Sequence, residues 1–311
     1  MTETSSPANT GPVLVDTFGR QITYLRVSVT DRCDLRCVYC MAEEMTFVPR
    51  SQLLTLEEIT RLGHVFTDLG VAKIRITGGE PLVRKNIIKV FQELGQRPGL
   101  KDLTITTNGT HLSRYAAQLK AAGVTRINIS LDTLHADRFR SLTRVGELSR
   151  TLKGIDDAIK AGFDRIKINS VILKHRNHEE CCDLVRFALE RGIDISFIEE
   201  MPLGMIGSHD RAEAYYSSDA ILRDLQQHYE LIPTTETTGG PSHYHRLNGS
   251  RIKVGFISPH SHNFCSSCNR VRLTAEGRLL LCLGQEHSVD LRRVVRAHPL
   301  DDEPLRRAII D

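Results

Sequence analysis

The sequence predicts an α/β protein, a partial (βα)6 barrel similar to an open TIM barrel, with a smaller C-terminal segment behind it. Short runs rich in β-branched residues alternate with longer amphipathic runs between residues 24 and 199. Glycine follows several of the amphipathic runs, as it does at the ends of many helices. This alternation predicts a parallel sheet with helical crossovers, and six units are fewer than the eight that close a full barrel.

The elements follow one another in a regular order. Strands are expected at residues 24–29, 72–76, 103–107, 126–130, 165–171 and 195–199. Helices are expected at residues 56–69, 84–94, 114–121, 148–161 and 179–190, and Thr55 is a suitable N-cap for the first of them. Because the composition changes after Met201, we divide the chain into a disordered tail (1–16), the barrel (17–201) and a C-terminal segment (202–311).

Composition excludes several classes of protein. The 311 residues carry 41 Lys and Arg against 38 Asp and Glu, which is not the basic excess of a nucleic-acid-binding protein. No apolar run is long enough for a transmembrane helix, and the N-terminal tail lacks the apolar stretch of a signal peptide. Eight cysteines in such a chain favour a reducing compartment over a disulfide framework. We therefore expect a cytoplasmic protein without a membrane or nucleic-acid partner.

Three cysteines, Cys33, Cys37 and Cys40, lie in one C-x3-C-x2-C stretch directly after the first predicted strand. Cysteine thiolates are the usual ligands of iron–sulfur clusters, and three of them leave one iron of a 4Fe–4S cluster without a protein ligand. Structural zinc sites use four ligands, commonly in C-x2-C pairs. The spacing therefore favours a cluster with an open iron over zinc.

A second turn, Gly78–Gly79–Glu80, follows the next predicted strand. The carboxyl ends of parallel strands share one edge of the sheet, so this turn should lie beside the cysteines. Glycine is common in ordinary βα turns, but here it also allows close approach of the backbone to a small ligand. We expect Glu80 to accept a hydrogen bond from an ammonium group of that ligand.

A second set of three cysteines comprises Cys265, Cys268 and Cys282. A nearby histidine (His260, His262 or His287) could complete a zinc site, and spacing alone does not separate zinc from a cluster. By analogy with the first set, we expect a second 4Fe–4S cluster whose open iron binds a substrate nitrogen.

Basic residues stand at strand ends or beside the cysteines, and together they favour a polyphosphate ligand because guanidinium groups bind phosphate oxygens in pairs. They are Arg26, Lys73, Arg75, Lys167, Arg270 and Arg272.

The first cysteine set with Tyr39 inside it, followed by Gly78–Gly79–Glu80–Pro81, resembles the radical S-adenosylmethionine superfamily. The resemblance implies a 4Fe–4S cluster that cleaves S-adenosyl-L-methionine and releases a 5′-deoxyadenosyl radical. It also implies a set of cosubstrate contacts: Tyr39, Gly79, Glu80, Ser130 and Met201.

Longer stretches resemble the GTP 3′,8-cyclase family of molybdenum cofactor biosynthesis, namely residues 26–33, 75–82, 107–109, 128–132 and 265–274. The resemblance implies that the radical removes hydrogen from carbon 3′ of GTP, and that the resulting radical attacks carbon 8 of guanine. It implies that Arg26, Arg270 and Arg272 help to complete the reaction. The substrate contacts that it implies are Arg26, Lys73, Arg75, Thr106, Lys167, Arg270, Val271 and Arg272.

The same resemblance implies a reductant such as a flavodoxin, a downstream cyclic pyranopterin monophosphate synthase, and a homodimer. Two departures from the family pattern stand out: Ser196 occupies a position that is usually Arg, and the chain ends without a Gly-Gly tail, as a truncated chain would. Cys181 and Cys182 are adjacent on a predicted helix and are expected to be incidental thiols. The alternatives are a radical peptide maturase with an auxiliary cluster and a non-catalytic zinc-stabilised binding protein.

Overall fold

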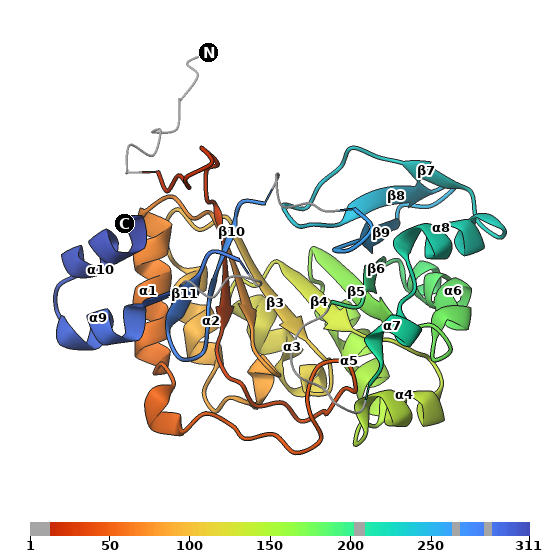
Figure 1. Ribbon diagram of the computed structural model, residues 1–311, viewed down its shortest axis with the longest axis horizontal. Helices are drawn as coiled ribbons and strands as arrows, with labels where there is room; N and C mark the ends of the chain where they lie inside the picture. Colours follow the sequence, from red (N-terminus) through yellow and green to blue (C-terminus); the bar gives the residue numbers. More distant parts are fainter. Residues whose placement is uncertain (1–12, 202–208, 263–267, 283–287) are drawn as a thin grey trace, which may run out of the picture.

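The computed structural model describes residues 13–201, 209–262, 268–282 and 288–311. Its centre is a row of parallel strands that alternate with helices, as the sequence predicts (Figure 1). The predicted strands lie within one or two residues of the observed ones, which are β1 (Tyr24–Ser28), β2 (Lys73–Thr77), β3 (Asp102–Thr107), β4 (Arg126–Ser130), β5 (Arg165–Ile172) and β6 (Asp194–Glu199).

Each strand has two chemically different faces. On β1, Leu25 and Val27 are fully buried in the main apolar core, and Ile74 and Ile76 on β2 are buried in the same core. Burial of such side chains against the surrounding helices is the main favourable term for this fold. Because side chains alternate along a strand, Arg26 and the other intervening residues line the opposite, inner face of the curved sheet, which we call the lumen.

The helices begin and end where local chemistry allows. Thr55 and Glu58 form a capping box at the start of the first helix, which confirms the predicted N-cap. The helix predicted at 84–94 was placed too early: Asn86 has a φ of 61°, which a continuous helix does not permit. The helices of the barrel are α1 (Leu56–Asp68), α2 (Ile88–Gly95), α3 (Leu112–Ala121), α4 (Ala136–Thr143), α5 (Leu148–Lys160) and α6 (Cys181–Arg191), with short 3-10 turns η1 (Arg50–Gln52), η2 (Pro81–Val83) and η3 (His178–Glu180).

The C-terminal segment extends the same sheet at both edges. β9 (Lys253–Ile257) pairs in parallel with β6, and β10 (Arg270–Leu273) pairs in parallel with β1. The remaining strands pair antiparallel outside these two, giving the order β12-β11-β10-β1-β2-β3-β4-β5-β6-β9-β8-β7. They are β7 (Leu231–Pro233), β8 (His243–Leu247), β11 (Arg278–Leu280) and β12 (Ser288–Asp290). The lumen is thus walled by more strands than the six that the sequence predicts.

Four further helices follow the barrel in the described residues: α7 (Arg211–Ala214), α8 (Ser218–Gln226), α9 (Leu291–Ala297) and α10 (Glu303–Ile310). Figure 1 shows α9 and α10 beside α1, on the opposite side of the molecule from β7, β8 and β9. Arg61 of α1 pairs with Asp302 at 2.7 Å and donates to the carbonyl oxygens of His298 and Asp301, each at 2.7 Å. No helix among the described residues has the length and apolar character needed to cross a membrane.

Candidate active site

The first cysteine set lies on the loop after β1, at the carboxyl ends of the parallel strands. Cys33 and Cys37 are partly buried and Cys40 is exposed. Among the described residues, no three His, Cys, Asp or Glu side chains surround one point closely enough to hold a single metal ion. A 4Fe–4S cluster does not need that convergence, because each thiolate binds a different iron.

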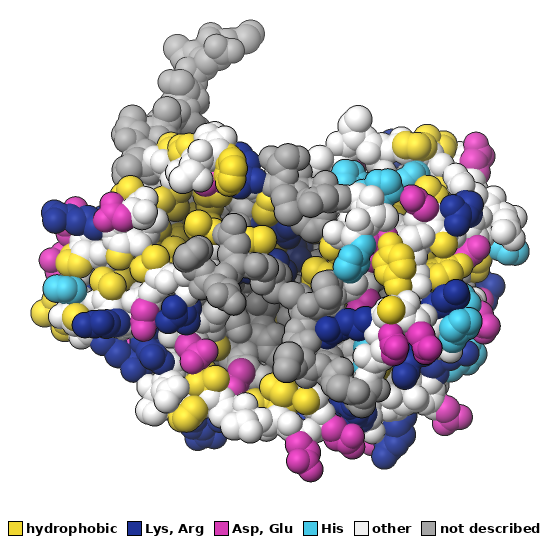
Figure 2. Space-filling view, viewed as in Figure 1, with side chains coloured by type: hydrophobic (Ala, Val, Ile, Leu, Met, Phe, Trp, Pro, Cys, Tyr) yellow, Lys and Arg dark blue, Asp and Glu magenta, His cyan; other side chains and the backbone are white. Residues whose placement is uncertain are grey.

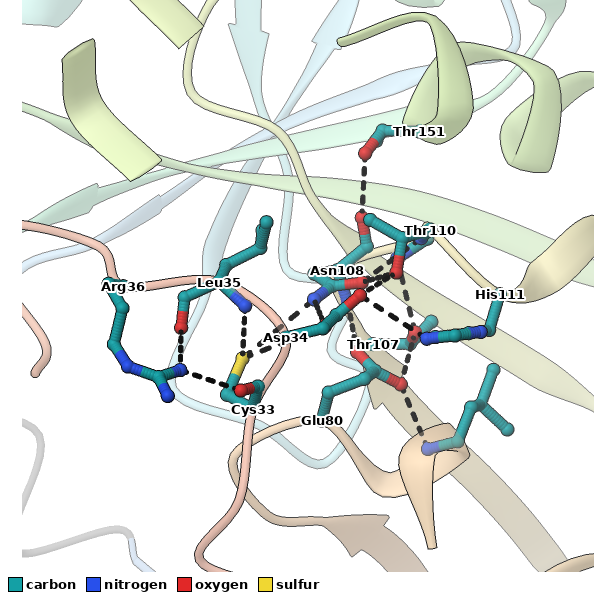
Figure 3. Close-up of polar contacts among 12 residues, drawn as sticks. Cys33, Asp34, Leu35, Arg36, Glu80, Thr107, Asn108, Thr110, His111 and Thr151 are labelled. Atoms are coloured by element: carbon teal, nitrogen blue, oxygen red, sulfur yellow. Dashed lines mark hydrogen bonds and ion pairs between the residues drawn. The ribbon is translucent and has the colours of Figure 1, made fainter. Parts of the chain in front are cut away.

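A polar network anchors this loop to the end of β3 (Figure 3). The Asp34 carboxylate accepts hydrogen bonds from Asn108 Nδ2 at 2.7 Å and Thr110 Oγ1 at 2.6 Å, and it lies 3.2 Å from His111 Nε2. Burial raises the pKa of Asp34, but the hydrogen bonds from His111, Thr110 and Asn108 outweigh it and hold the pKa well below its usual range.

Cys33 Sγ, an expected cluster ligand, also has hydrogen-bond donors near it. Cys33 Sγ lies 3.4 Å from the Leu35 amide nitrogen and 3.8 Å from Asn108 Nδ2, and both groups can donate to it. N–H donors around sulfur are a normal feature of iron–sulfur sites and tune their reduction potential. The loop therefore suits a cluster both by its ligands and by the groups around them.

The glycine turn packs against the backbone of the cysteine loop. A Cβ atom on Gly79 would lie 2.4 Å from the Arg32 carbonyl oxygen, so a side chain cannot be accommodated there. The Gly79 amide donates to the Thr30 carbonyl at 2.8 Å, and the Glu80 amide donates to the Arg32 carbonyl at 2.8 Å. The glycine turn therefore approaches the backbone of the cysteine loop closely, and its predicted approach to a small ligand stays a prediction.

The Glu80 carboxylate is fully buried and accepts hydrogen bonds within the protein. Its donors are the Leu82 amide at 3.0 Å, Thr107 Oγ1 at 2.8 Å and the Asn108 amide at 2.7 Å. Burial raises the pKa of Glu80 to about 7. This side chain joins the turns after β2 and β3, and the predicted contact of Glu80 with a ligand ammonium stays a prediction.

The other expected cosubstrate residues lie at the same edge of the sheet. Tyr39 donates from its hydroxyl to Asp132 Oδ2 at 2.6 Å, just beyond β4, and the Val171 amide donates to Asp132 Oδ1 at 2.8 Å. Burial raises the pKa of Asp132 to about 6. Ser130 ends β4, and Met201 is half-buried two residues beyond β6. The fold thus brings together residues that are far apart in sequence.

Arginines from three neighbouring strands lie side by side in the lumen. Arg26 of β1 is the register partner of Arg75 on β2 and of Arg272 on β10. We call these three residues the cationic row. One step nearer the amino ends of the strands, Tyr24 is the partner of both Lys73 and Arg270. Figure 2 shows Lys and Arg side chains in the hollow between the β7–β9 side of the molecule and its opposite side.

The positive charges of the cationic row repel one another in a buried setting. Burial, together with the neighbouring guanidinium groups, lowers the pKa of Arg26 to about 10 and that of Arg272 to about 9. Burial raises the pKa of Tyr24, but Arg75, Arg26 and the other cations around it lower the pKa overall. Because the arginines remain charged at neutral pH, the lumen holds an excess of positive charge that an anion would relieve.

Several buried polar atoms in the lumen have no hydrogen-bond partner among the described residues. They include Arg26 Nε, Asn128 Nδ2 and Asn169 Oδ1. Buried polar groups in folded proteins are nearly always hydrogen-bonded, so atoms such as these mark a place where a ligand supplies the partner. Donors and an acceptor on three strands therefore suit a ligand that is both anionic and polar.

The remaining predicted substrate residues differ in their surroundings. Lys73 pairs with Asp102 Oδ2 at 2.8 Å, and Lys167 donates to the Tyr244 hydroxyl at 3.1 Å. Thr106 is half-buried and faces the lumen beside its register partner Asn128. Val271 is different, because its side chain is buried in the apolar core on the outer face of β10, away from the lumen.

The second cysteine set is described in part, since Cys265 and His287 lie outside the described residues. Cys268 precedes β10 and Cys282 follows β11, and these two strands are antiparallel, so both cysteines lie at the same end of the hairpin. Their thiols are also close enough to Arg272 to affect its pKa. Because β10 runs parallel to β1, this end is opposite the first cysteine loop, and the cationic row lies between that loop and the pair Cys268 and Cys282.

Some residues at the site were not predicted from the sequence. Asp34, Thr110 and His111 carry no motif of their own, although Asn108 lies in a stretch that carried the family resemblance. Tyr244 on β8 had no detectable signal either. Ser196, where the family resemblance implied an arginine, is fully buried and lies 3.0 Å from Ser242, Oγ to Oγ.

Comparison with known families identifies the class of protein. The family model for the Radical SAM superfamily matches residues 27–188, and the model for Molybdenum Cofactor Synthesis C matches residues 193–311. Among solved structures, Streptococcus suis SuiB bound to S-adenosylmethionine is similar in fold, with a TM-score of 0.64 and 18% identity over 94% of this chain and 69% of that one. The chain belongs to the radical SAM superfamily.

Two named relatives narrow the classification from the superfamily to one family. A GTP 3′,8-cyclase of Saccharophagus degradans is 58% identical over 298 residues, which are 96% of this chain and 90% of that protein. A GTP 3′,8-cyclase of Marinobacter nauticus is 59% identical over 297 residues, with the same coverage. Within the superfamily, the chain therefore belongs to the GTP 3′,8-cyclase family.

Proposed function

We propose that this chain converts GTP to 3′,8-cyclo-7,8-dihydro-GTP in the first step of molybdenum cofactor biosynthesis, and that it holds GTP in the lumen between its two cysteine sets. The observation that carries the proposal is the position of the cationic row between the first cysteine loop and the described cysteines of the second set, Cys268 and Cys282. The triphosphate is the part of GTP that a group of neighbouring arginines suits best.

The residues of the first site fit a 4Fe–4S cluster and S-adenosyl-L-methionine. Cys33, Cys37 and Cys40 would hold the cluster, and the Asp34 network fixes their loop. Tyr39, Gly79, Glu80, Ser130 and Met201 would contact the cosubstrate, by the family resemblance. When bound, this pair supplies the radical that removes hydrogen from carbon 3′ of the ribose.

The second set, Cys265, Cys268 and Cys282, would hold a second 4Fe–4S cluster that anchors the guanine. The chain itself would orient the nucleotide through Arg26, Lys73, Arg75, Thr106, Lys167, Arg270, Val271 and Arg272, of which Val271 could act only through its backbone. Arg26, Arg270 and Arg272 would also help to complete the reaction. Holding ribose and guanine in one geometry is the main contribution of a protein to such a ring closure.

The proposal also includes a reductant, a downstream enzyme, an oligomeric state and a cellular compartment. A small reductant such as a flavodoxin would reduce the first cluster next to exposed Cys40. The product would pass to a cyclic pyranopterin monophosphate synthase. We further propose a cytoplasmic homodimer, as the family resemblance implies, and the free thiols of the described cysteines suit a reducing compartment.

A cysteine replacement separates the roles of the two sites. Cys265→Ser should still release 5′-deoxyadenosine from S-adenosyl-L-methionine, because the first site is intact, but should form no cyclised GTP. Cys182→Ser is the matched control, since Cys182 lies on α6 and belongs to neither cysteine set. The wild-type protein, purified anaerobically, should contain about eight irons per chain with equivalent sulfide.

Each contrary result points to a different alternative. Zinc without sulfide would indicate a binding protein and not an enzyme. Normal cyclisation by Cys265→Ser would show that the second set has no role in holding the substrate. Clusters and S-adenosyl-L-methionine cleavage with no reaction of GTP would favour a radical peptide maturase.

A further inference from the structure

Tyr244, from the C-terminal segment, reaches into the lumen between strands. It lies on β8 opposite Gly255 of β9, and Gly255 in turn lies opposite Ser196 of β6. A Cβ atom on Gly255 would lie 2.8 Å from Tyr244 Cε1, 2.6 Å from Ser196 Oγ and 2.2 Å from Ser242 Oγ. Glycine at this position therefore leaves the space that the Tyr244 ring fills, and the ring is almost completely buried.

The Tyr244 hydroxyl joins groups on opposite walls of the lumen. Lys167 of β5 donates to it at 3.1 Å, and Thr238 Oγ1 lies 3.1 Å from it. The carbonyl oxygen of Thr238 accepts from Lys73 of β2 at 2.9 Å. A continuous chain of contacts thus runs from β5 through β8 and the loop before it to β2, across strands that are not neighbours in the sheet.

The type of partner matters for the charge of Lys167. Lys73 is paired with a carboxylate, Asp102, so part of its charge is neutralised. Lys167 instead has a phenol as its hydrogen-bond partner and forms no ion pair within the described part of the chain, although Asp194, its register partner on β6, acts on it electrostatically. An ammonium group has three N–H donors, and two of those on Lys167 have no hydrogen-bond partner among the described residues. Burial raises the pKa of Tyr244, but nearby Lys167 and the hydrogen bonds lower it to about 8.

We propose that Tyr244 is a positioning residue for the cyclisation, which holds the Lys167 ammonium so that its remaining donors meet the phosphate oxygens of GTP. The inference rests on the proposed function, because it needs Lys167 to bind the substrate. Tyr244 acts through Lys167 and not on the reacting atoms.

The test uses Tyr244→Phe in the anaerobically reconstituted enzyme, because this change removes only the hydroxyl. Loss of one hydrogen bond to a charged group should raise the KM for GTP about tenfold. The KM for S-adenosyl-L-methionine should stay unchanged, and kcat should fall less than the KM for GTP rises. Tyr229→Phe is the control, since its hydroxyl donates to the Cys182 carbonyl at 3.1 Å, outside the lumen, and it should leave both KM values unchanged.

A double-mutant cycle identifies the route. Lys167→Met should raise the KM for GTP, and adding Tyr244→Phe to it should raise the KM no further. Full additivity of the two changes would overturn the positioning role, as would equal increases in the KM values for GTP and S-adenosyl-L-methionine in Tyr244→Phe.

Two results separate this inference from the proposed function. If Lys167→Met leaves the KM for GTP unchanged, the proposed substrate contact fails, and the role of Tyr244 fails with it. If Lys167→Met raises it and Tyr244→Phe does not, only the role of Tyr244 fails. Should Tyr244→Phe not fold, Thr238→Val removes the next hydroxyl in the chain of contacts and should raise the KM for GTP about threefold. An unchanged KM would then overturn the inference.

Discussion

Replacing Arg26 by Met should make the GTP-free protein more stable. The pKa of Arg26 falls from its usual value to about 10 in the fold, because the guanidinium is buried beside other cations. Each pKa unit corresponds to about 1.4 kcal/mol, so keeping Arg26 charged costs roughly 3 kcal/mol. Part of the side chain is still accessible to solvent, and we therefore expect a gain of about 2 kcal/mol in the free energy of unfolding.

The pH dependence of this effect has a definite sign. A basic group whose pKa is lower in the folded chain destabilises the fold wherever it is protonated in both states. For Arg26 that is every pH below about 10, and the penalty disappears as the pH rises from there toward the usual pKa of arginine. At neutral pH the whole difference between wild type and variant should therefore be present.

GTP should reverse the order of stability. A ligand that binds only the folded state raises stability in proportion to the logarithm of its concentration over Kd. Wild type should gain from GTP, and Arg26→Met should gain much less because it lacks the proposed phosphate contact. The assay is denaturant unfolding under anaerobic conditions with and without GTP, with Arg165→Met, at the exposed start of β5, as control. A less stable Arg26→Met protein without GTP would refute the idea of an unrelieved cationic row.

Three further changes test the supports of the site. Asp34→Asn should lower the free energy of unfolding by about 2 kcal/mol and slow 5′-deoxyadenosine release, because the carboxylate anchors the cysteine loop. Glu199→Gln should cost about 2 kcal/mol in denaturant unfolding, since Glu199 accepts hydrogen bonds from the His260 amide at 3.1 Å and the Ser218 amide at 2.8 Å. A buried carboxyl with a raised pKa makes the protein less stable as the pH rises from 4.5 to about 7. Glu80→Gln should abolish this fall, measured as unfolding free energy against pH.

Matched controls make these three outcomes decisive. Glu44→Gln and Glu213→Gln change exposed carboxylates and should have little effect on unfolding. Asp34→Asn or Glu199→Gln behaving like these controls would show that the hydrogen bonds described for them do not hold the site together. An unchanged pH profile in Glu80→Gln would show that Glu80 is not the group that titrates.

The sequence predicted the strands of the barrel well because their patterns are local. Alternating residues such as Leu25 and Val27 mark the outer face, and glycine after several of the helices marks their ends. The place of β10 beside β1 could not be predicted, because it depends on pairing between segments more than 200 residues apart. The role of Asp34 was missed for a similar reason, since its partners come from another strand end.

Two features of the site could be recognised only in the three-dimensional structure. Motif spacing placed Gly79 next to the first cysteine set, but only the structure shows that the Arg32 carbonyl excludes any side chain there. Tyr244 lies on a short edge hairpin whose residues carry no motif. Its approach to Lys167 depends on the absence of a side chain at Gly255, which no local pattern indicates.

The most direct test of the account is an anaerobic turnover with S-adenosyl-L-methionine and GTP that carries deuterium at carbon 3′ of the ribose. If the lumen holds GTP with its ribose toward the first cysteine loop, deuterium should appear in 5′-deoxyadenosine and cyclised GTP should accumulate. 5′-Deoxyadenosine that forms without deuterium, or GTP that is recovered unchanged, would contradict the account.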